Sequence, residues 1–319
     1  MSLVRIVAVS APLLLALADE VRAQDGRPTA GARAPDSPST LKVAAVQSRS
    51  CRDLDENVAQ IQGHIRRLAE AGVRVAVFPE CALTGYFEDL VTMTTAERLA
   101  EAERRVADAC REAGIYAVVG TPHRDGDRLY NSAVVIDPSG WIIERHHKIQ
   151  LAERWPSPGD HLSAFKVEGV PCSIIICHDE RYPELVRLPV LAGARVIVYI
   201  SHESSVRQES KIGPYRAQIQ ARAVENTVYV VQANAPANDD LSGSHGRSRV
   251  IAPDGNLAHE ASMFGEEVVT ADLDLRKATA ENARRSLVRG PLADWWREGV
   301  KRVRVIKEET GDDSQVSGR

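Results

Sequence analysis

The feature that most constrains the fold is a series of short, almost wholly apolar runs that alternate with helical segments. Such runs lie at residues 73–79, 115–119, 173–176 and 195–199. Runs this apolar predict strands covered on both faces, by helices on one side and by a second sheet on the other. Two hairpin-like units, with turns at residues 137–140 and 252–255, fall at corresponding places in the two halves. The pattern predicts a single α/β domain.

Helical segments separate these runs. Apolar residues recur at three- and four-residue spacing between residues 58 and 68, and good helix formers fill residues 96–113 before Gly114. Further helices are expected at about residues 183–192 and 215–226. The chain has five cysteines, an odd number that does not suggest a disulfide framework, and Cys172 is expected to be a small buried hydrophobe.

Three chemically active side chains each follow an apolar run. Glu80 follows the run at 73–79, Lys148 comes soon after residues 141–145, and Cys177 follows residues 173–176. Open α/β sheets present their sites at such strand ends. A thiol at a strand-to-helix junction is also expected to have a lowered pKa and to lie beside free backbone N–H groups. Taken singly, each residue is more simply a buried thiol or a solvated charge, so the proposal depends on their joint occurrence.

Three strings around these residues resemble the signature blocks of the nitrilase (carbon–nitrogen hydrolase) superfamily, in the family's order. They are Phe78-Pro79-Glu80, His147-Lys148-Ile149 and the run from Cys177 to Glu184. Shorter agreements occur at residues 83–86, 131–133 and 222–226. The resemblance covers residues 41–275. It implies a four-layer αββα sandwich, with two mixed sheets packed face to face, helices outside and the site between strand ends.

The resemblance also implies a mechanism that needs no cofactor. Cys177 would attack the carbonyl carbon and form a thioester, with Glu80 as general base. Lys148 and the backbone N–H of His178 would hold the oxyanion. Glu153 resembles a second glutamate of the family that aligns the lysine or the substrate. No metal is expected, because His146 and His147 would face opposite sides of a strand, and His178 with the next aspartate lacks a third ligand at zinc-like spacing.

Departures from the family pattern indicate the substrate class. His178 stands where true nitrilases have tryptophan, and Asp179 replaces their glutamate. Both changes favour a small linear amide or an N-carbamoyl compound over a nitrile. His202 and Glu203, in the loop after residues 195–199, are expected to contact the substrate, as is Tyr86.

Other functions remain open on the sequence alone. The same thioester could serve acyl transfer or nitrile hydrolysis, and a non-catalytic binding protein could keep the fold. Retention of Glu80, Lys148 and Cys177 together argues against the last. A nucleic-acid partner is not expected, since the net charge is −4 and only 5% of residues are aromatic.

The two ends of the chain differ from the middle. Residues 1–23 have the layout of a secretory signal peptide, with Arg5, an apolar stretch at 6–17 and cleavage expected after Ala23, which would make the protein periplasmic or secreted. Residues 24–40 read as a disordered linker, and no integral membrane segment is expected elsewhere. In the extension at 276–319, Leu292, Trp296, Val300 and Val303 follow at helical spacing. That helix would pack on its own core or reach a partner in a homodimer or higher homo-oligomer.

Overall fold

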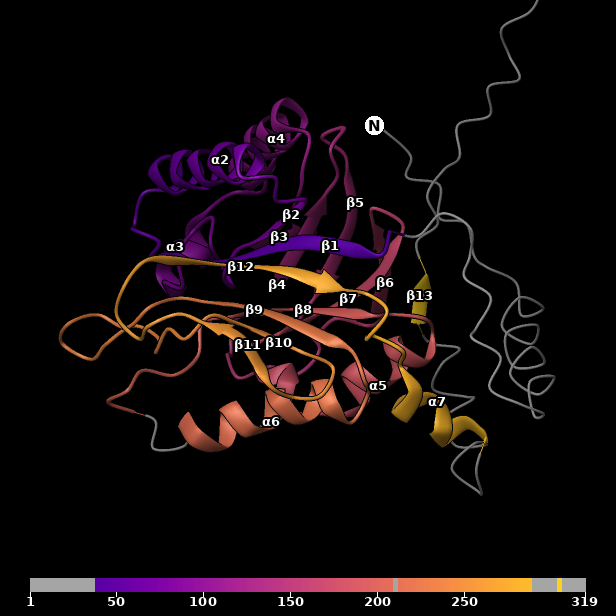
Figure 1. The fold of residues 1–319 in the computed structure, drawn as a ribbon. Helices are drawn as coiled ribbons and strands as arrows, with labels where there is room; N and C mark the ends of the chain where they lie inside the picture. Colours follow the sequence, from indigo (N-terminus) through magenta and orange to yellow (C-terminus); the bar gives the residue numbers. More distant parts are fainter. Residues whose placement is uncertain (1–37, 209–211, 289–302, 306–319) are drawn as a thin grey trace, which may run out of the picture.

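The computed structural model describes residues 38–208, 212–288 and 303–305. Within these ranges the chain forms two facing sheets (Figure 1). The first has the strand order β12-β1-β2-β3-β4-β5, and its strands are β1 (Thr40–Gln47), β2 (Val75–Val77), β3 (Tyr116–Asp125), β4 (Arg128–Ile136), β5 (Ile142–His147) and β12 (Glu267–Asp274). The second has the order β11-β10-β9-β8-β7-β6-β13, and its strands are β6 (Leu162–Val167), β7 (Val170–Ile176), β8 (Val196–Ser201), β9 (Tyr229–Asn234), β10 (Arg249–Ile251), β11 (Leu257–Glu260) and β13 (Val303–Val305).

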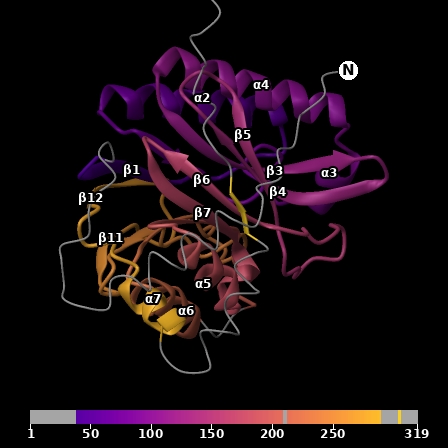
Figure 2. The same cartoon turned by 90° about the vertical axis from the view of Figure 1, so that its right-hand side faces the viewer.

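Helices cover the outer face of each sheet, as Figure 2 shows from the side. Above the first sheet lie α2 (Leu54–Glu70) and α4 (Ala96–Ala113), and below the second lie α5 (Glu184–Leu191), α6 (Ile212–Val224) and α7 (Glu281–Val288). The short helices α3 (Glu88–Met93) and the 3-10 helix η1 (Cys177–Arg181) lie in connections. The predicted four-layer αββα sandwich is therefore confirmed.

Local sequence explains where the helices begin and end. The Asp53 side chain accepts hydrogen bonds from two backbone N–H groups in the first turn of α2, and the Thr95 side chain accepts one from the first turn of α4. Gly114 ends α4 in the left-handed region at φ 68°, which glycine adopts without a Cβ penalty.

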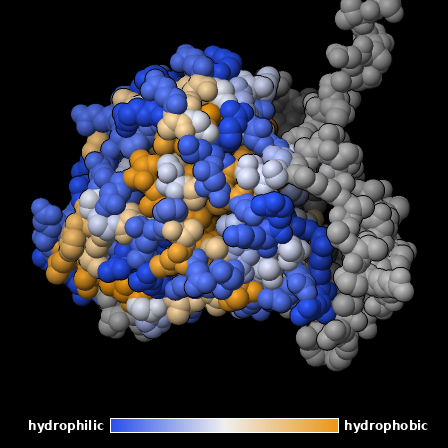
Figure 3. Space-filling view, viewed as in Figure 1, coloured by the Kyte–Doolittle hydropathy of each residue, from blue (hydrophilic) through white to orange (hydrophobic). Residues whose placement is uncertain are grey.

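Alternation along the inner strands builds three apolar layers. Ile174 and Ile176 on β7 face the first sheet, in the core between the sheets, whereas Ile175 faces the helices below. The third layer packs α2 and α4 on the first sheet, through side chains such as Ile61 and Val106. Cys172 is buried in the central layer, which confirms its predicted role as a small hydrophobe. On the face of the molecule shown in Figure 3, hydrophobic residues form small patches among hydrophilic ones.

The C-terminal segment departs from its predicted structure. Val303, expected on a helix, begins strand β13, which pairs in parallel with β6 from Leu162 to Ala164. The edge of the second sheet offers unpaired backbone groups at this point, and pairing with them favours a strand over the helix that the apolar spacing suggested. The expected helical positions 292, 296 and 300 lie outside the described residues, as do the predicted signal peptide and most of the linker. No helix in the described ranges is long and apolar enough to cross a membrane.

Candidate active site

Strand direction brings the three strand-end residues to one edge of the sandwich. Strand β2 is parallel to β1 and β3, and β7 is parallel to β8 and β9. Strand β5 runs in the same direction as β3, because β4 is antiparallel to both. Glu80, Lys148 and Cys177 each lie just beyond the carboxyl end of one of these strands, where the two sheets meet.

The Glu80 turn is held by close backbone packing. Cys81 has a φ of 52°, in the left-handed region that non-glycine residues seldom adopt. Gly120 on β3 lies directly against this turn. A Cβ at Gly120 would come within 2.2 Å of the Pro79 carbonyl oxygen and 2.7 Å of the Glu80 Cα. Only glycine at this position lets Glu80 sit where it does.

Glu80 is 2% exposed and accepts three hydrogen bonds. Its Oε1 accepts from Lys148 Nζ at 2.8 Å and from Asn131 Nδ2 at 2.6 Å, and its Oε2 accepts from the His202 backbone N–H at 2.8 Å. Burial raises the pKa of Glu80, although Lys148 acts to lower it. A carboxylate with a raised pKa is well matched to proton transfer near neutral pH.

Lys148 lies between two carboxylates. Its Nζ, fully buried, donates to Glu80 Oε1 and, at 2.6 Å, to Glu153 Oε1, which also accepts from the Tyr86 hydroxyl. Burial disfavours the ammonium form, but the negative charges of Glu80 and Glu153 reverse that effect and raise the pKa of Lys148 well above its ordinary value. Lysine therefore stays charged, as an oxyanion donor requires.

Burial also acts on Glu153, whose pKa it would raise. The charge and hydrogen bond of Lys148 outweigh that effect, so the pKa of Glu153 is lowered. The two glutamates on one lysine thus differ: Glu153 is held ionised and Glu80 is the more readily protonated. Two carboxyl groups whose environments push their pKa values apart are suited to different tasks.

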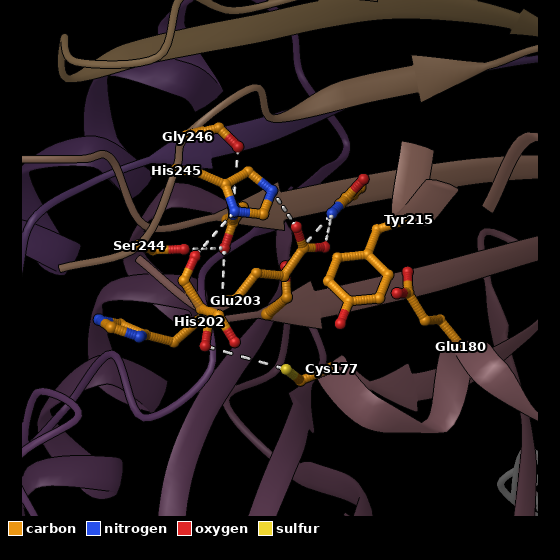
Figure 4. A network of polar contacts seen from close by, with 12 residues as sticks. Cys177, Glu180, His202, Glu203, Tyr215, Ser244, His245 and Gly246 are labelled. Carbon is orange, nitrogen blue, oxygen red and sulfur yellow. Dashed lines mark hydrogen bonds and ion pairs between the residues drawn. The ribbon is translucent and has the colours of Figure 1, made fainter. Parts of the chain in front are cut away.

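Cys177 begins η1 with a φ of 46°, so its backbone is held in a sparsely populated conformation. The Asp179 carboxylate holds this turn, since it accepts from the backbone N–H of Ile176 at 3.0 Å and of Gln150 at 2.7 Å. The thiol points to the His202 carbonyl oxygen, with Sγ at 3.9 Å (Figure 4). His202 therefore lies between the two side chains. Its carbonyl oxygen faces the Cys177 thiol, and its backbone N–H donates to Glu80.

The expected lowering of the Cys177 pKa is wrong. Burial, followed by the negative charge of Glu80, raises the pKa of this thiol well above its ordinary value, and Lys148 only partly opposes the rise. The turn that follows is the five-residue η1 and not an α-helix, so no long helix dipole favours the thiolate. The Cys177 thiol is therefore neutral at rest, and such a thiol becomes a strong nucleophile only when a base takes its proton.

A cavity of about 400 Å³ reaches this cluster at Glu80, whereas Lys148, Glu153 and Cys177 are not among its lining residues. Glu80, Tyr86 and His202 line it, and the Tyr86 and His202 rings stack at 4.6 Å. Burial lowers the pKa of His202 to about 4, so the ring is neutral. The remaining lining residues are Arg49, Ser50, Pro79, Phe87, Ala235, Pro236, Asn238, Ser242 and Gly243.

Two predicted substrate contacts are not among the residues that line this cavity. Glu203 lies in a buried network, hydrogen-bonded to Tyr199 and Gln232 and paired with His245 (Figure 4). It follows the same strand end as His202, but the next side chain along the chain points the opposite way. His178 is half-buried, with its ring against the edge of Tyr182.

Asn131 is the site residue that reasoning from the sequence missed. It bridges Glu80 and Glu153, with Nδ2 at 2.6 and 3.4 Å. The string at residues 131–133 belonged to the resemblance, but an amide on a strand gives no local sign that it faces a carboxylate. Among the residues that the structure describes, no group of three or more His, Cys, Asp or Glu side chains could hold a metal ion.

Comparison with known proteins gives matches of both sequence and fold. A model of the carbon–nitrogen hydrolase family matches residues 42–282. A "Nitrilase" of Pyrococcus abyssi is 33% identical over 245 residues, covering 74% of this chain and 90% of that protein, and an "Omega-amidase NIT2" of Danio rerio is 30% identical over 260 residues, covering 75% and 90%. Saccharomyces cerevisiae Nit3, of branch 10 of the nitrilase superfamily, superposes with a TM-score of 0.70 at 26% identity, over 79% of this chain and 97% of that one. An amidase of Nesterenkonia AN1 has a TM-score of 0.71 at 22% identity, over 82% and 99%.

Proposed function

The chain belongs to the carbon–nitrogen hydrolase family, as its sequence predicted, and we propose that it hydrolyses a small linear amide or N-carbamoyl compound through a thioester on Cys177. One observation carries the proposal. A buried ammonium, Lys148, is shared by Glu80 and Glu153 beside a cysteine whose backbone is strained. A merely structural cluster has no need for a buried cation beside a thiol.

The proposed first half-reaction follows from these protonation states. Cys177 Sγ attacks the substrate carbonyl carbon while Glu80 takes the thiol proton. Lys148 and the His178 backbone N–H stabilise the negative charge that develops on the carbonyl oxygen. The tetrahedral intermediate then breaks its C–N bond, Glu80 passes the proton to the departing nitrogen, and ammonia or an amine leaves a thioester on Cys177.

Water completes the proposed cycle. Glu80, again ionised, takes a proton from water as the water oxygen attacks the thioester carbon. The C–S bond breaks, the sulfur recovers a proton from Glu80, and a carboxylic or carbamic acid is released. Glu153 keeps Lys148 charged and in place through both steps, because their contact is short and buried.

Amides are favoured over nitriles by His178 and Asp179, at the positions where nitrilases have tryptophan and glutamate. Relatives named omega-amidase support the same choice, although a relative of slightly higher identity is named nitrilase. Ammonia release from matched panels of amides, carbamoyl amines and nitriles separates these substrates. Faster turnover of nitriles than of every amide would overturn the substrate class.

The mechanism is tested with two cysteines, Cys172 on β7 and Cys177 at the start of η1. Cys177→Ala should abolish turnover, whereas Cys172→Ala, in the core between the sheets, should keep kcat near that of wild type. Intact-mass measurement during turnover should detect an acyl adduct on the wild type and on Cys172→Ala. Turnover that survives Cys177→Ala would end the proposed mechanism.

Export and assembly are proposed on the sequence alone. The apolar stretch at residues 6–17 supports a signal peptide, and N-terminal sequencing of protein from the native host should begin at Gln24. An intact Met1 would contradict export.

We also propose that the chain forms a homodimer or higher homo-oligomer. Gel filtration of the full chain beside a chain cut before Pro291 tests whether the C-terminal extension is needed for that assembly.

A further inference from the structure

One hydroxyl lies between two buried carboxyl groups beneath the Cys177 turn. Tyr199, on β8, is fully buried. Its hydroxyl oxygen is 2.8 Å from Glu180 Oε2 and 2.9 Å from Glu203 Oε1, and 3.3 Å from the Cys177 carbonyl oxygen. Glu180 belongs to η1, three residues after the nucleophile, and Figure 4 places it with Glu203 on the same side of Cys177.

Counting hydrogens limits the ionisation of this cluster. A tyrosine hydroxyl has one hydrogen to donate, and an ionised carboxylate can only accept. Two ionised carboxylates cannot both be satisfied by Tyr199. For the 2.8 and 2.9 Å contacts both to be hydrogen bonds, one of Glu180 and Glu203 carries a proton of its own and donates it to the Tyr199 oxygen.

The partners of Glu203 identify it as the ionised member. Gln232 has its orientation set by Arg249, whose Nε donates to Gln232 Oε1 at 2.7 Å, so its Nε2 donates to Glu203 Oε1 at 2.8 Å. His245 places Nδ1 at 3.0 Å from the Ser204 carbonyl oxygen, which only accepts, and Nε2 against Glu203 Oε2. Burial disfavours a charged imidazole, but Glu203 outweighs it and raises the pKa of His245. An imidazolium on an anionic Glu203 satisfies every one of these contacts.

Glu180 has no such support. It is 3% exposed, and within the described ranges no cation forms an ion pair with its carboxyl. Tyr199 faces it from β8, Glu203 from the following loop and Arg249 from β10. Arg249 donates through Nε to Gln232 and pairs through Nη1 with Glu260 at 3.6 Å. Burial and then the charge of Glu203 raise the pKa of Glu180 to about 8.

The nearest arginines on η1 and α6 are occupied elsewhere. Arg181 stacks on the Tyr215 ring at 4.7 Å and bonds its hydroxyl. Arg222 donates through Nε to the backbone oxygen of Glu180 at 2.9 Å and pairs with Glu225 through Nη1. Both hold η1 in place without neutralising the Glu180 carboxyl.

We propose that Glu180 is a positioning residue, kept as a neutral acid at neutral pH, so that the single Tyr199 hydrogen is shared in a three-centre bond between Glu203 Oε1 at 2.9 Å and the Cys177 carbonyl oxygen at 3.3 Å. The inference rests on the proposed function of Cys177. Release of the Glu180 proton to solvent at alkaline pH would set two anions against one hydroxyl and draw the Tyr199 hydrogen away from the Cys177 turn. The strained nucleophile would then lose a hydrogen bond that holds it.

Glu180→Gln tests this directly, because an amide keeps a donor for Tyr199 but cannot ionise. Wild-type kcat should fall with an apparent pKa near 8, while Glu180→Gln should keep kcat within about twofold at neutral pH and lack that fall. Tyr199→Phe should lower kcat about tenfold with little change in KM. Glu225→Gln, which removes a carboxylate from Arg222 and not from Tyr199, should leave the alkaline fall unchanged. An alkaline fall that persists in Glu180→Gln would overturn the proposal.

A measurement that needs no turnover separates this inference from the proposed function. Infrared difference spectra of the wild type should contain a protonated-carboxyl C=O band at neutral pH that disappears near pH 8, and Tyr199→Phe should shift it. The component that disappears near pH 8 should be absent in Glu180→Gln, whereas a component from Asp179, whose burial raises its pKa to about 7, should remain. If the enzyme hydrolyses no amide but its spectrum keeps this band, only the proposed function is refuted. Absence of any such band in the wild type would sink the protonated Glu180.

Discussion

Replacing Lys148 by methionine should be among the most damaging single changes to this protein. Methionine keeps most of the side-chain volume but removes the ammonium that Glu80 and Glu153 share at 2.8 and 2.6 Å. Both carboxylates would remain buried without a cation. Removing one partner of a buried ion pair costs about 3–5 kcal/mol, and here two anions lose the same partner.

The pH dependence of this loss separates charge from packing. In the wild type the pKa of Glu153 lies below its ordinary value of 4.5, so its stabilising contribution is present above that pH and is lost as pH falls below it. In Lys148→Met both carboxyls should take raised pKa values and gain protons more readily. The stability difference between the two proteins should therefore shrink as pH falls from about 8 to about 5.

Urea unfolding at both pH values measures the effect, with Lys166→Met on the exposed face of β6 as the matched control. The control should change stability by less than about 0.5 kcal/mol. The variant should also lose about 10²–10³ in kcat, as expected for an absent oxyanion donor. A destabilisation under about 1 kcal/mol, or one that does not change with pH, would refute the charge argument. In a double-mutant cycle, Glu80→Gln should recover part of the loss.

Three further predictions concern the groups around the base. Asn131→Ala should lower kcat about tenfold, because Glu80 loses a 2.6 Å hydrogen bond; unchanged kcat would contradict this contact. Gly120→Ala should displace Glu80 and lower both activity and stability, whereas Gly63→Ala, inside α2, should be neutral or stabilising; equal effects would show that the close packing is unimportant. Because the folded state raises the pKa of Glu180, the contribution of this residue to stability is complete below about pH 4.5 and is lost as pH rises to about 8. Glu180→Gln cannot ionise, so its stability relative to wild type should grow across that window by more than about 1 kcal/mol. Chemical unfolding would measure this difference.

The sequence by itself determined the layers and the strand-end chemistry. Apolar runs long enough for one strand, helical spacing between them and the helix end at Gly114 are local patterns, and the structure has elements where they predict them. Glu80, Lys148 and Cys177 could be chosen because each follows a strand and lies in a family string. Only the joint pattern pointed to them, since each residue type alone has a simpler explanation.

The tertiary structure alone decided how these groups behave. Burial sets the resting state of the Cys177 thiol, and it overrode the lowered pKa that its place after a strand suggested. The cavity is lined by His202 and not by its neighbour Glu203, which a buried histidine holds in a separate network. Strand β13 pairs where helical spacing predicted otherwise. Protonation and partners depend on which side chains from distant strands meet and on how much water is excluded there, and no local run of residues encodes those quantities.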